Sequence, residues 1–224
     1  MYKRAWDNLC DRTITKQALI EVIEGTSALT KGYCGFSGEE RRVLFERIET
    51  YGTLQNKERH LSSYFSNSEG VDYFQMAVFE RHLQMQLFSG LNHPEERLSE
   101  YFWNHCGLKL EKRKNETFGY YLPGKFHLFQ RNEAWSFPHN SDFILIWVIS
   151  CKSTQASFAI HKPTKPYGLG PCMREADVKY AWLQTGALTI FKPGTTLTLE
   201  NSNHPILAYV CRGKLDKHKI VVWA

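Results

Sequence analysis

Six cysteines and nine histidines are the residues of this chain that could carry nucleophilic chemistry. A cysteine becomes a nucleophile when a neighbouring histidine helps to form its thiolate. Cys151 and His161 end one expected strand and its neighbour, and Cys34 precedes an expected helix, with His161 and Asp177 as candidate partners. With so many cysteines and histidines some suggestive spacing arises by chance, and free cysteines are commonly buried. We therefore expect structural cysteines, with a cysteine-dependent hydrolase or deamidase as an alternative.

Other well-known catalytic and metal motifs are not found in the sequence. No two cysteines stand two to four residues apart, so the spacing does not predict a structural zinc site. The phosphate-binding, dinucleotide-binding, nucleophile-elbow and zinc-protease motifs are also missing. These observations disfavour nucleotide hydrolysis, Rossmann redox chemistry, α/β-hydrolase chemistry and zinc proteolysis.

The composition is that of a globular protein. The chain has 224 residues, of which 42% are hydrophobic and 23% are charged, with a net charge of +5. The longest apolar run, Phe143–Ser150, is far shorter than the roughly 20 residues that a membrane helix needs. The first residues carry charge and no apolar core of a signal peptide. We therefore expect a soluble cytoplasmic protein without a membrane partner.

The elements that must position these residues begin with a helical region. Apolar residues recur at helical spacing from residue 13 to about 107, and glycines punctuate the pattern. Ser37 and Glu40 form a capping box. The expected helices span residues 15–25, 37–52, 71–88 and 92–107, with 53–66 ambiguous.

After residue 107 the pattern changes to short β-rich runs between Gly, Pro, Asn and Ser clusters. Two of these runs, 108–112 and 117–121, are expected to form a hairpin. The further expected strands span residues 126–130, 142–151, 157–161, 178–183, 187–191, 195–199, 206–211 and 219–223. The run 142–151 is apolar on both faces, which predicts a central strand. About eight strands at such spacing predict a sandwich or jelly roll.

The C-terminal forty residues carry a sharper pattern. A strand leads to Pro193 and Gly194, a second strand follows, and a polar turn places His204 before the next strand. The chain then reaches Lys217, six residues before Trp223. This pattern resembles the C-terminal half of the double-stranded β-helix of the Fe(II)/2-oxoglutarate dioxygenases, in particular the prolyl-hydroxylase-like branch. The segment 120–126 is similar to the family's lead-in, so the resemblance covers about 117–224.

The resemblance implies a set of site residues. His204 corresponds to the distal metal histidine, ten residues after Gly194, and His139 and Asp142 are the nearest candidates for the other Fe(II) ligands. Lys217 corresponds to the basic residue that holds the 2-oxoglutarate carboxylate, and Tyr121 is a candidate hydrogen-bond partner. If Lys217 begins the final strand, period two places it on one face and Ile220 on the other. We expect Lys217 to point into the same cavity as His204.

The family's first metal motif, His-x-Asp/Glu on one strand face, is not found. At the position after the lead-in the chain reads Gln130-Arg131-Asn132, and an amide pair is a poor iron ligand set. His139 and Asp142 are three residues apart, which places them on opposite faces of a strand unless the segment is a loop. The pattern therefore predicts a degenerate or atypical metal site, with Fe(II) and 2-oxoglutarate as cofactors or none.

A basic segment, 109–114, is followed by Phe118, Tyr120 and Tyr121. Basic residues with aromatics can grip a nucleic-acid backbone and stack bases. Edge strands commonly carry lysine for solubility, and we favour a solvated edge hairpin. Nucleic acid is the alternative partner for this segment.

Together these patterns predict an α+β protein in which an N-terminal helical layer, 1–112, packs on a C-terminal double-stranded β-helix, 113–224, as one compact unit. The leading hypothesis is a 2-oxoglutarate/Fe(II) oxygenase-like protein acting on an unknown small-molecule or protein substrate. The alternative from another class is a non-catalytic jelly-roll protein with a binding or regulatory role. If the chain is an enzyme, we expect a 2-oxoglutarate-dependent oxygenase.

Overall fold

The computed structural model describes residues 13–48, 73–115, 119–131, 134–137, 139–161 and 178–224. The chain divides into two compact units. One unit combines the residues up to Gly35 with Leu98–Ala224, and the other is Phe36–Arg97. The chain mixes helices with strands, and most of the strands lie in sheets.

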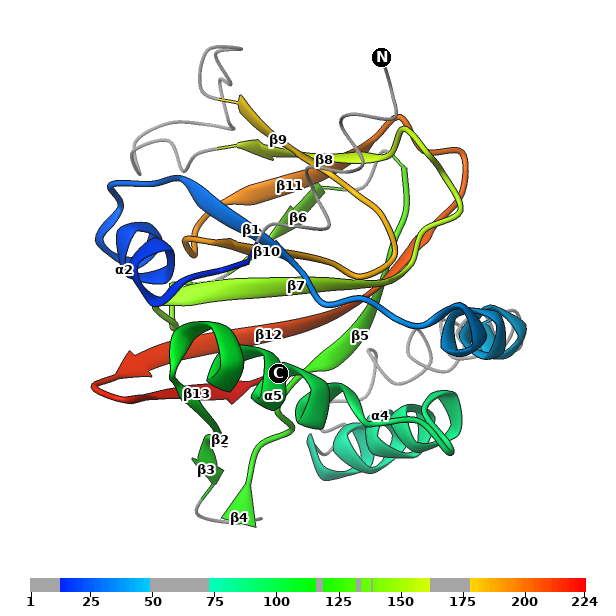
Figure 1. Ribbon diagram of the computed structural model, residues 1–224, viewed down its shortest axis with the longest axis horizontal. Helices are drawn as coiled ribbons and strands as arrows, with labels where there is room; N and C mark the ends of the chain where they lie inside the picture. The colour runs from blue at the N-terminus through cyan, green and yellow to red at the C-terminus, as the bar shows by residue number, and fades with distance from the viewer. Residues whose placement is uncertain (1–12, 49–72, 116–118, 132–133, 138, 162–177) are drawn as a thin grey trace. The chain divides into compact units, whose positions relative to one another are not determined.

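The larger sheet of the first unit has seven strands (Figure 1). Its strands are, in spatial order, β1 (Leu29–Tyr33), β10 (Ala187–Phe191), β7 (Phe143–Ser150), β12 (Ile206–Asp216), β13 (Lys219–Trp223) and β2 (Lys109–Lys112), with β5 (Lys125–Phe129) also paired to β12. All of these pairs are antiparallel except the parallel pair of β13 and β2.

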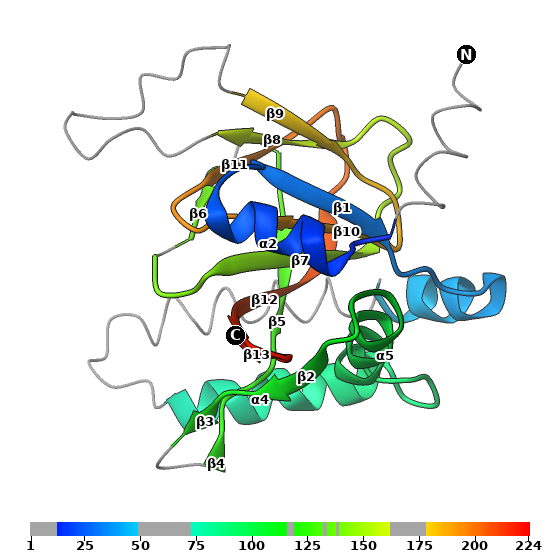
Figure 2. The same ribbon diagram turned by 60° about the vertical axis from the view of Figure 1, so that its left-hand side comes forward.

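A smaller sheet lies over one face of the larger sheet, as the two views in Figures 1 and 2 show. Its strands are, in order, β6 (Ala134–Ser136), β11 (Thr196–Glu200), β8 (Ser157–His161) and β9 (Val178–Trp182). One buried apolar cluster takes side chains from both sheets, for example Ile146 of β7 and Phe158 of β8. The inner faces of the two sheets therefore share this apolar interior.

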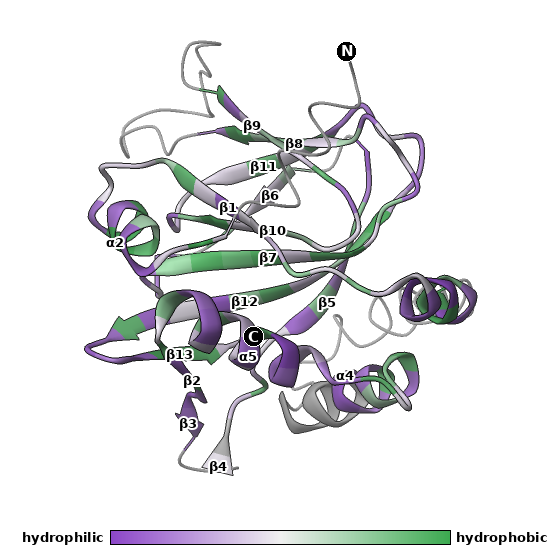
Figure 3. Ribbon diagram, viewed as in Figure 1, coloured by the Kyte–Doolittle hydropathy of each residue, from purple (hydrophilic) through white to green (hydrophobic). Residues whose placement is uncertain are grey.

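Strand β7 is the most buried element of the sheets. All eight of its residues are buried, and Figure 3 shows hydrophobic colour along most of its length. Ile144 and Ile146 face the smaller sheet, whereas Trp147 points to the other side, where its indole N–H donates to the carbonyl of Cys34 at 2.9 Å. The predicted central strand is therefore confirmed, since β10 and β12 flank it.

Helix α2 (Lys16–Glu24) begins and ends as its sequence predicts. The Thr15 hydroxyl accepts the N–H of Ala18 at 3.1 Å, which caps the first turn. Gly25 ends the helix in the left-handed conformation with a φ of 83°. Leu19 and Val22 are buried, and the helix contacts β1 and β10.

Strand β1 was not expected from the sequence, which placed this region among helices. Its Gly32 allows a close approach, because a Cβ atom there would collide with the Tyr101 hydroxyl. The same hydroxyl accepts the backbone N–H of Ile14 at 2.9 Å, and burial raises the pKa of Tyr101 to about 12. Tyr101 lies on helix α5 (Pro94–Cys106), so α5 holds the N-terminal segment on the sheet.

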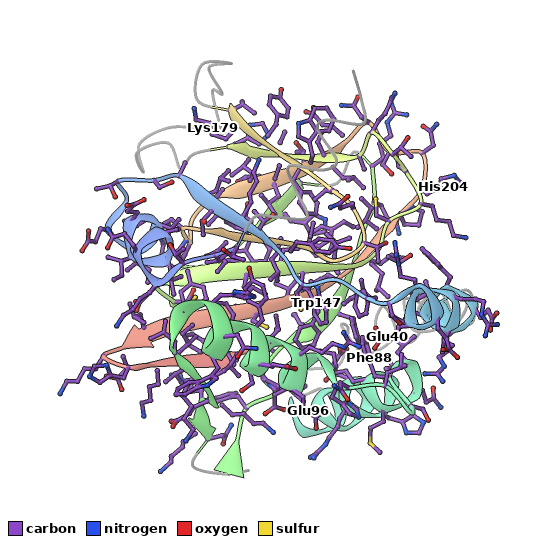
Figure 4. All side chains as sticks on the ribbon, viewed as in Figure 1. Glu40, Phe88, Glu96, Trp147, Lys179 and His204 are labelled. Atoms are coloured by element: carbon purple, nitrogen blue, oxygen red, sulfur yellow. The ribbon has the colours of Figure 1, made fainter. Side chains whose placement is uncertain are left out.

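The second unit is helical. The capping box is confirmed, because the Ser37 N–H donates to the Glu40 carboxylate at 2.7 Å and the Glu40 N–H donates to the Ser37 hydroxyl at 3.2 Å. Residues 38–48 are helical, and α4 (Tyr73–Leu87) follows. Glu40, which Figure 4 labels, forms an ion pair with Arg97, whose guanidinium also lies 4.9 Å from the centre of the Phe36 ring.

Several other expectations are corrected. The strand 109–112 pairs with β13 and not with the following strand, and the small hairpin consists of β3 (Lys114–Asn115) and β4 (Gly119–Tyr120). Strand β6 was also not expected. Helix α5 begins at Pro94, with its cap at His93 and not at Asn92. The ambiguous segment 53–66 and the predicted helix end at residue 52 lie outside the described residues. No helix among the described residues is long and apolar enough to cross a membrane.

The burial of β7 predicts the effect of a charge at Ile146. The side chain is 1% exposed, so Ile146→Asp buries an unpaired carboxylate and should lower the free energy of unfolding by at least about 3 kcal/mol. Lys214→Asp, at an exposed position of β12, is the control and should change it little. Urea titration measures both variants, and an unchanged midpoint for Ile146→Asp would contradict the assignment of β7.

Candidate functional site

The two ends of the paired sheets carry different residues. At one end β7 begins, β10 ends and β11 begins, and we name it the Gly194 end. At the other end β7 ends and β12 begins after the turn that contains His204, and we name it the His204 end. Figure 4 shows His204 at this end, opposite Lys179 at the start of β9.

The three residues expected to bind Fe(II) are not brought together. His204 is exposed in the turn between β11 and β12. His139 is exposed at the other end of β11, where its ring lies against Gly194 in the space that a Cβ atom would take. The Asp142 carboxylate accepts the backbone N–H of Leu215 at 3.1 Å, which ties the start of β7 to β12.

The described residues do not fit an iron centre. Strand β11 has five residues, so its ends are about 13 Å apart, whereas ligands of one metal ion lie within roughly 4 Å of one another. No group of three His, Cys, Asp or Glu side chains that could hold a metal occurs in the part of the chain that the structure describes. Near Gly194 the interior is filled by the rings of Phe137 and Phe191, 5.6 Å apart.

Lys217 also differs from its expected position. It lies in the two-residue turn between β12 and β13, has a φ of 50° and is exposed, whereas Ile220 is fully buried. The expectation that Lys217 begins the last strand and points into a cavity with His204 is therefore wrong. The cause is that β12 continues to Asp216, five residues beyond the predicted end. Tyr121 packs against the guanidinium of Arg113, 5.3 Å from the ring centre.

A different set of basic residues lines the inner face of the larger sheet. Lys125 of β5 lies opposite Val210, and His127 lies opposite Ala208. Directly opposite residues share one face of a sheet, and Val210 and Ala208 belong to the apolar interior. Arg212 follows Val210 by two residues, so it continues the same face toward the Gly194 end.

We name Arg212, Lys125 and His127, together with Trp135 of β6, the inner wall. Its electrostatics are unusual for an apolar interior. Burial, together with the charges of Lys125 and Arg212, lowers the pKa of His127 to about 3, so its imidazole is neutral at pH 7. Arg212 is half-buried, and its guanidinium has no hydrogen bond or ion pair with any described residue. The indole N–H of Trp135 is buried without a partner among the described residues, and its ring lies 4.9 Å from that of His127.

The sequence carries one signal for this inner wall that the motifs considered above do not include. The residues Ile206, Ala208 and Val210 alternate in one strand as small or branched apolar side chains. Extending that period by two residues reaches Arg212, which therefore occupies the next inward position. Lys125 and His127 could not be placed without the register that pairs β5 with β12.

The expected cysteine–histidine pairs are not formed. Cys34 and Cys151 lie at the His204 end. The N–H of Cys34 donates to the carbonyl of Gly186, just before β10 begins, and Cys151 directly follows the end of β7. His161 lies opposite Thr196 at the Gly194 end and bonds the hydroxyl of Thr198 at 3.1 Å. Asp177 lies outside the described residues. Neither cysteine is placed to be activated by His161.

The basic segment 109–114 is partly neutralised. Glu111 pairs with Lys219 at 3.0 Å and with Lys109 at 3.4 Å. The guanidinium of Arg113 lies 4.8 Å from the centre of the Trp223 ring. Lys109, Lys219 and Arg113 therefore each have a partner within the protein.

Comparisons with known proteins show the fold. No protein-family model matches the chain, and no curated protein matches its sequence. Two solved structures of an N-substituted L-amino acid dioxygenase from Burkholderia ambifaria AMMD are similar. The structure in complex with alpha-KG has a TM-score of 0.51 at 10% identity, over 93% of this chain and 90% of that chain. The other has a TM-score of 0.52 at 11% identity, over 95% and 92%. The chain therefore has a dioxygenase-like fold.

The pKa of His127 predicts an acid-dependent loss of stability. The folded value of about 3 lies below the unfolded value of about 6.5, so the unfolded chain binds the proton first as the pH falls. The free energy of unfolding should fall by up to about 1.4 kcal/mol per pH unit between these values. Urea titrations at pH 7, 5.5 and 4.5 measure this slope. His127→Gln should flatten it, whereas His218→Gln in the exposed turn should not.

Burial also predicts slow reactions of two thiols. Burial raises the pKa of Cys106 to about 11 and also raises the pKa of Cys151. The thiolate fraction of Cys106 at pH 8 is then about one in a thousand, against about a quarter in an unfolded chain. Iodoacetamide labelling followed by mass spectrometry should show both thiols protected in the native protein and labelled in urea. Fast native labelling of Cys151 would instead support cysteine catalysis.

Proposed function

We propose that the first unit is a double-stranded β-helix of the 2-oxoglutarate dioxygenase type. The eight strands from β5 to β12 support this, because they divide into the orders β5-β12-β7-β10 and β6-β11-β8-β9. Chain neighbours mostly alternate between the two sheets, as in a jelly roll of two Greek keys. The likeness of the whole chain to a dioxygenase agrees with this topology.

Within this fold, we propose that the inner wall of Arg212, Lys125, His127 and Trp135 binds the carboxylate of a small acid such as 2-oxoglutarate. The observation that carries the proposal is Arg212, a cation beside the apolar interior with no paired anion among the described residues. A half-buried guanidinium is costly unless it is solvated or meets an anion. A carboxylate is the anion that matches its geometry.

Each residue of the wall has a distinct part in such binding. The planar guanidinium of Arg212 can donate two parallel hydrogen bonds to one carboxylate. Lys125 adds a positive charge, and it lies two residues before His127 on the same face of β5. The unpartnered N–H of Trp135 can donate to a second acceptor of the ligand. Because His127 is neutral at physiological pH, the net charge of the inner wall does not change over that pH range.

Fe(II) has no step in this proposal, because the described residues do not supply a ligand set for it. The resulting function is that of a carboxylate-binding protein on an oxygenase-like scaffold. A bound carboxylate would lie near Phe137 and Phe191, whose rings close the interior toward the Gly194 end.

Binding of 2-oxoglutarate tests the proposal. Isothermal titration calorimetry of the full chain should show binding that Arg212→Gln weakens at least tenfold, since a charge-assisted pair is worth about 1.5–3 kcal/mol. Lys125→Gln should weaken it less, by up to about fivefold. Lys217→Gln is the matched control, because it removes a cation from the exposed turn, and it should have no effect.

Two results would overturn the proposal. Equal affinity for the wild type and Arg212→Gln would exclude the inner wall, and a loss confined to Lys217→Gln would restore the site expected from the sequence. Repeating the titration with EDTA and with Mn(II) shows whether the binding of 2-oxoglutarate requires a metal ion. Binding that requires Mn(II) would contradict the carboxylate-binding function proposed above and would favour an iron-type oxygenase centre.

A further inference from the structure

The outer face of the smaller sheet carries two exposed aromatic residues. Tyr180 is 50% exposed and Trp182 is 54% exposed, although most aromatic side chains of this unit are buried. Both lie on β9, and Ala181 between them points into the interior. Alternate residues of a strand are about 7 Å apart on one face, so the two rings lie side by side.

The registers of β8, β9 and β11 fix what surrounds these rings. Trp182 lies opposite Ser157, which lies opposite Glu200. In the next row Tyr180 lies opposite Ala159, which lies opposite Thr198. A third row joins His161 to Thr196, which bonds the hydroxyl of Ser136 at 3.0 Å. We name these outward residues the aromatic face: Tyr180, Trp182, Ser157, Ala159, His161, Thr196, Thr198 and Glu200.

Two polar atoms of the aromatic face lack the partner that their burial demands. Ser157 is 1% exposed, and its hydroxyl has no hydrogen bond to any described residue. The Nδ1 atom of His161 is also buried without a partner among them. Buried polar atoms are nearly always hydrogen-bonded, so an unpartnered pair beside exposed rings indicates a missing polar partner.

The charge of the aromatic face selects the chemistry of that partner. Among the described residues, its outward side chains include hydroxyls, an imidazole and one carboxylate, but no lysine or arginine. Lys31 of β1 lies at its edge, where its ammonium donates to the backbone carbonyl of Tyr180 at 2.7 Å. A single-stranded nucleic acid could stack on the rings, but its phosphates need cations, whereas the charged side chain on the described face is the Glu200 carboxylate. A neutral ligand rich in hydroxyl groups needs no cation. Its C–H faces can pack on aromatic rings while its hydroxyls bond Ser, Thr, His and Glu side chains.

We propose that the aromatic face binds a neutral oligosaccharide, with adjacent sugar rings packed on Tyr180 and Trp182. Glu200 and Thr198 accept or donate hydrogen bonds at the opposite side of the same sugars. This site lies outside the interior, because Tyr180 and Trp182 alternate with the inward Ala181. It is therefore independent of the carboxylate site proposed for Arg212.

Titration with linear hexasaccharides tests this inference. The probes are maltohexaose, cellohexaose, laminarihexaose and xylohexaose, added to the full chain while tryptophan fluorescence and calorimetry are recorded. At least one probe should bind with a Kd on the order of 0.1–1 mM. Trp182→Ala and Tyr180→Ala should each weaken that binding at least tenfold, and Trp182→Phe should keep part of it.

The controls separate stacking from unfolding. Trp103→Ala removes another exposed tryptophan, 63% exposed on α5, and should leave the affinity unchanged. Arg212→Gln should also leave it unchanged, so that a failure of the carboxylate site does not affect the result. The inference is overturned if no hexasaccharide binds up to 10 mM, if binding is insensitive to Trp182, or if a single-stranded RNA dodecamer competes for the face.

Discussion

The double burial of β7 is the constraint on which the first unit depends. A strand with apolar residues on both faces cannot lie at a surface, so each face needs its own cover. The smaller sheet covers the face of β7 that carries Ile144 and Ile146. Trp147 points from the opposite face, where its indole N–H donates to the carbonyl of Cys34. The N-terminal segment is thereby drawn into the sheet as β1, although it is distant in sequence from the strand it helps to cover.

The sequence predicted the elements that are long, periodic or well punctuated. The capping box at Ser37, the helix ended by Gly25 and the apolar strand β7 each express one strong local preference. The strands β1 and β6 were missed because neither alternates clearly over its three to five residues, and pairing with distant strands fixes them. Long-range pairing also joins β2 to β13, where sequence proximity predicted a local hairpin.

The candidate site was less predictable because it depends on register. Histidines in turns attract attention in a sequence, but His139 and His204 lie at opposite ends of β11, and a motif cannot reveal this separation. One strand that runs five residues further than predicted moves Lys217 from a strand to a turn. The same strand continues its inward period to Arg212. Lys217 was the basic residue expected near the C-terminus, and Arg212, which we propose in its place, lies five residues earlier on β12.

Strand β12 changes neighbours along its length. Its first half pairs with β5 up to Val210, and its second half pairs with β13 from Arg212 onward. The N–H of Ala224, just after β13, donates to the carbonyl of Leu122, just before β5, at 2.8 Å, so the two neighbours of β12 are also joined to each other. Arg212 is the first residue of β12 that pairs with β13, and on its other side it pairs with Ile144 of β7. A carboxylate bound at the proposed site would therefore meet a guanidinium whose backbone is held by β7 on one side and by β13 on the other.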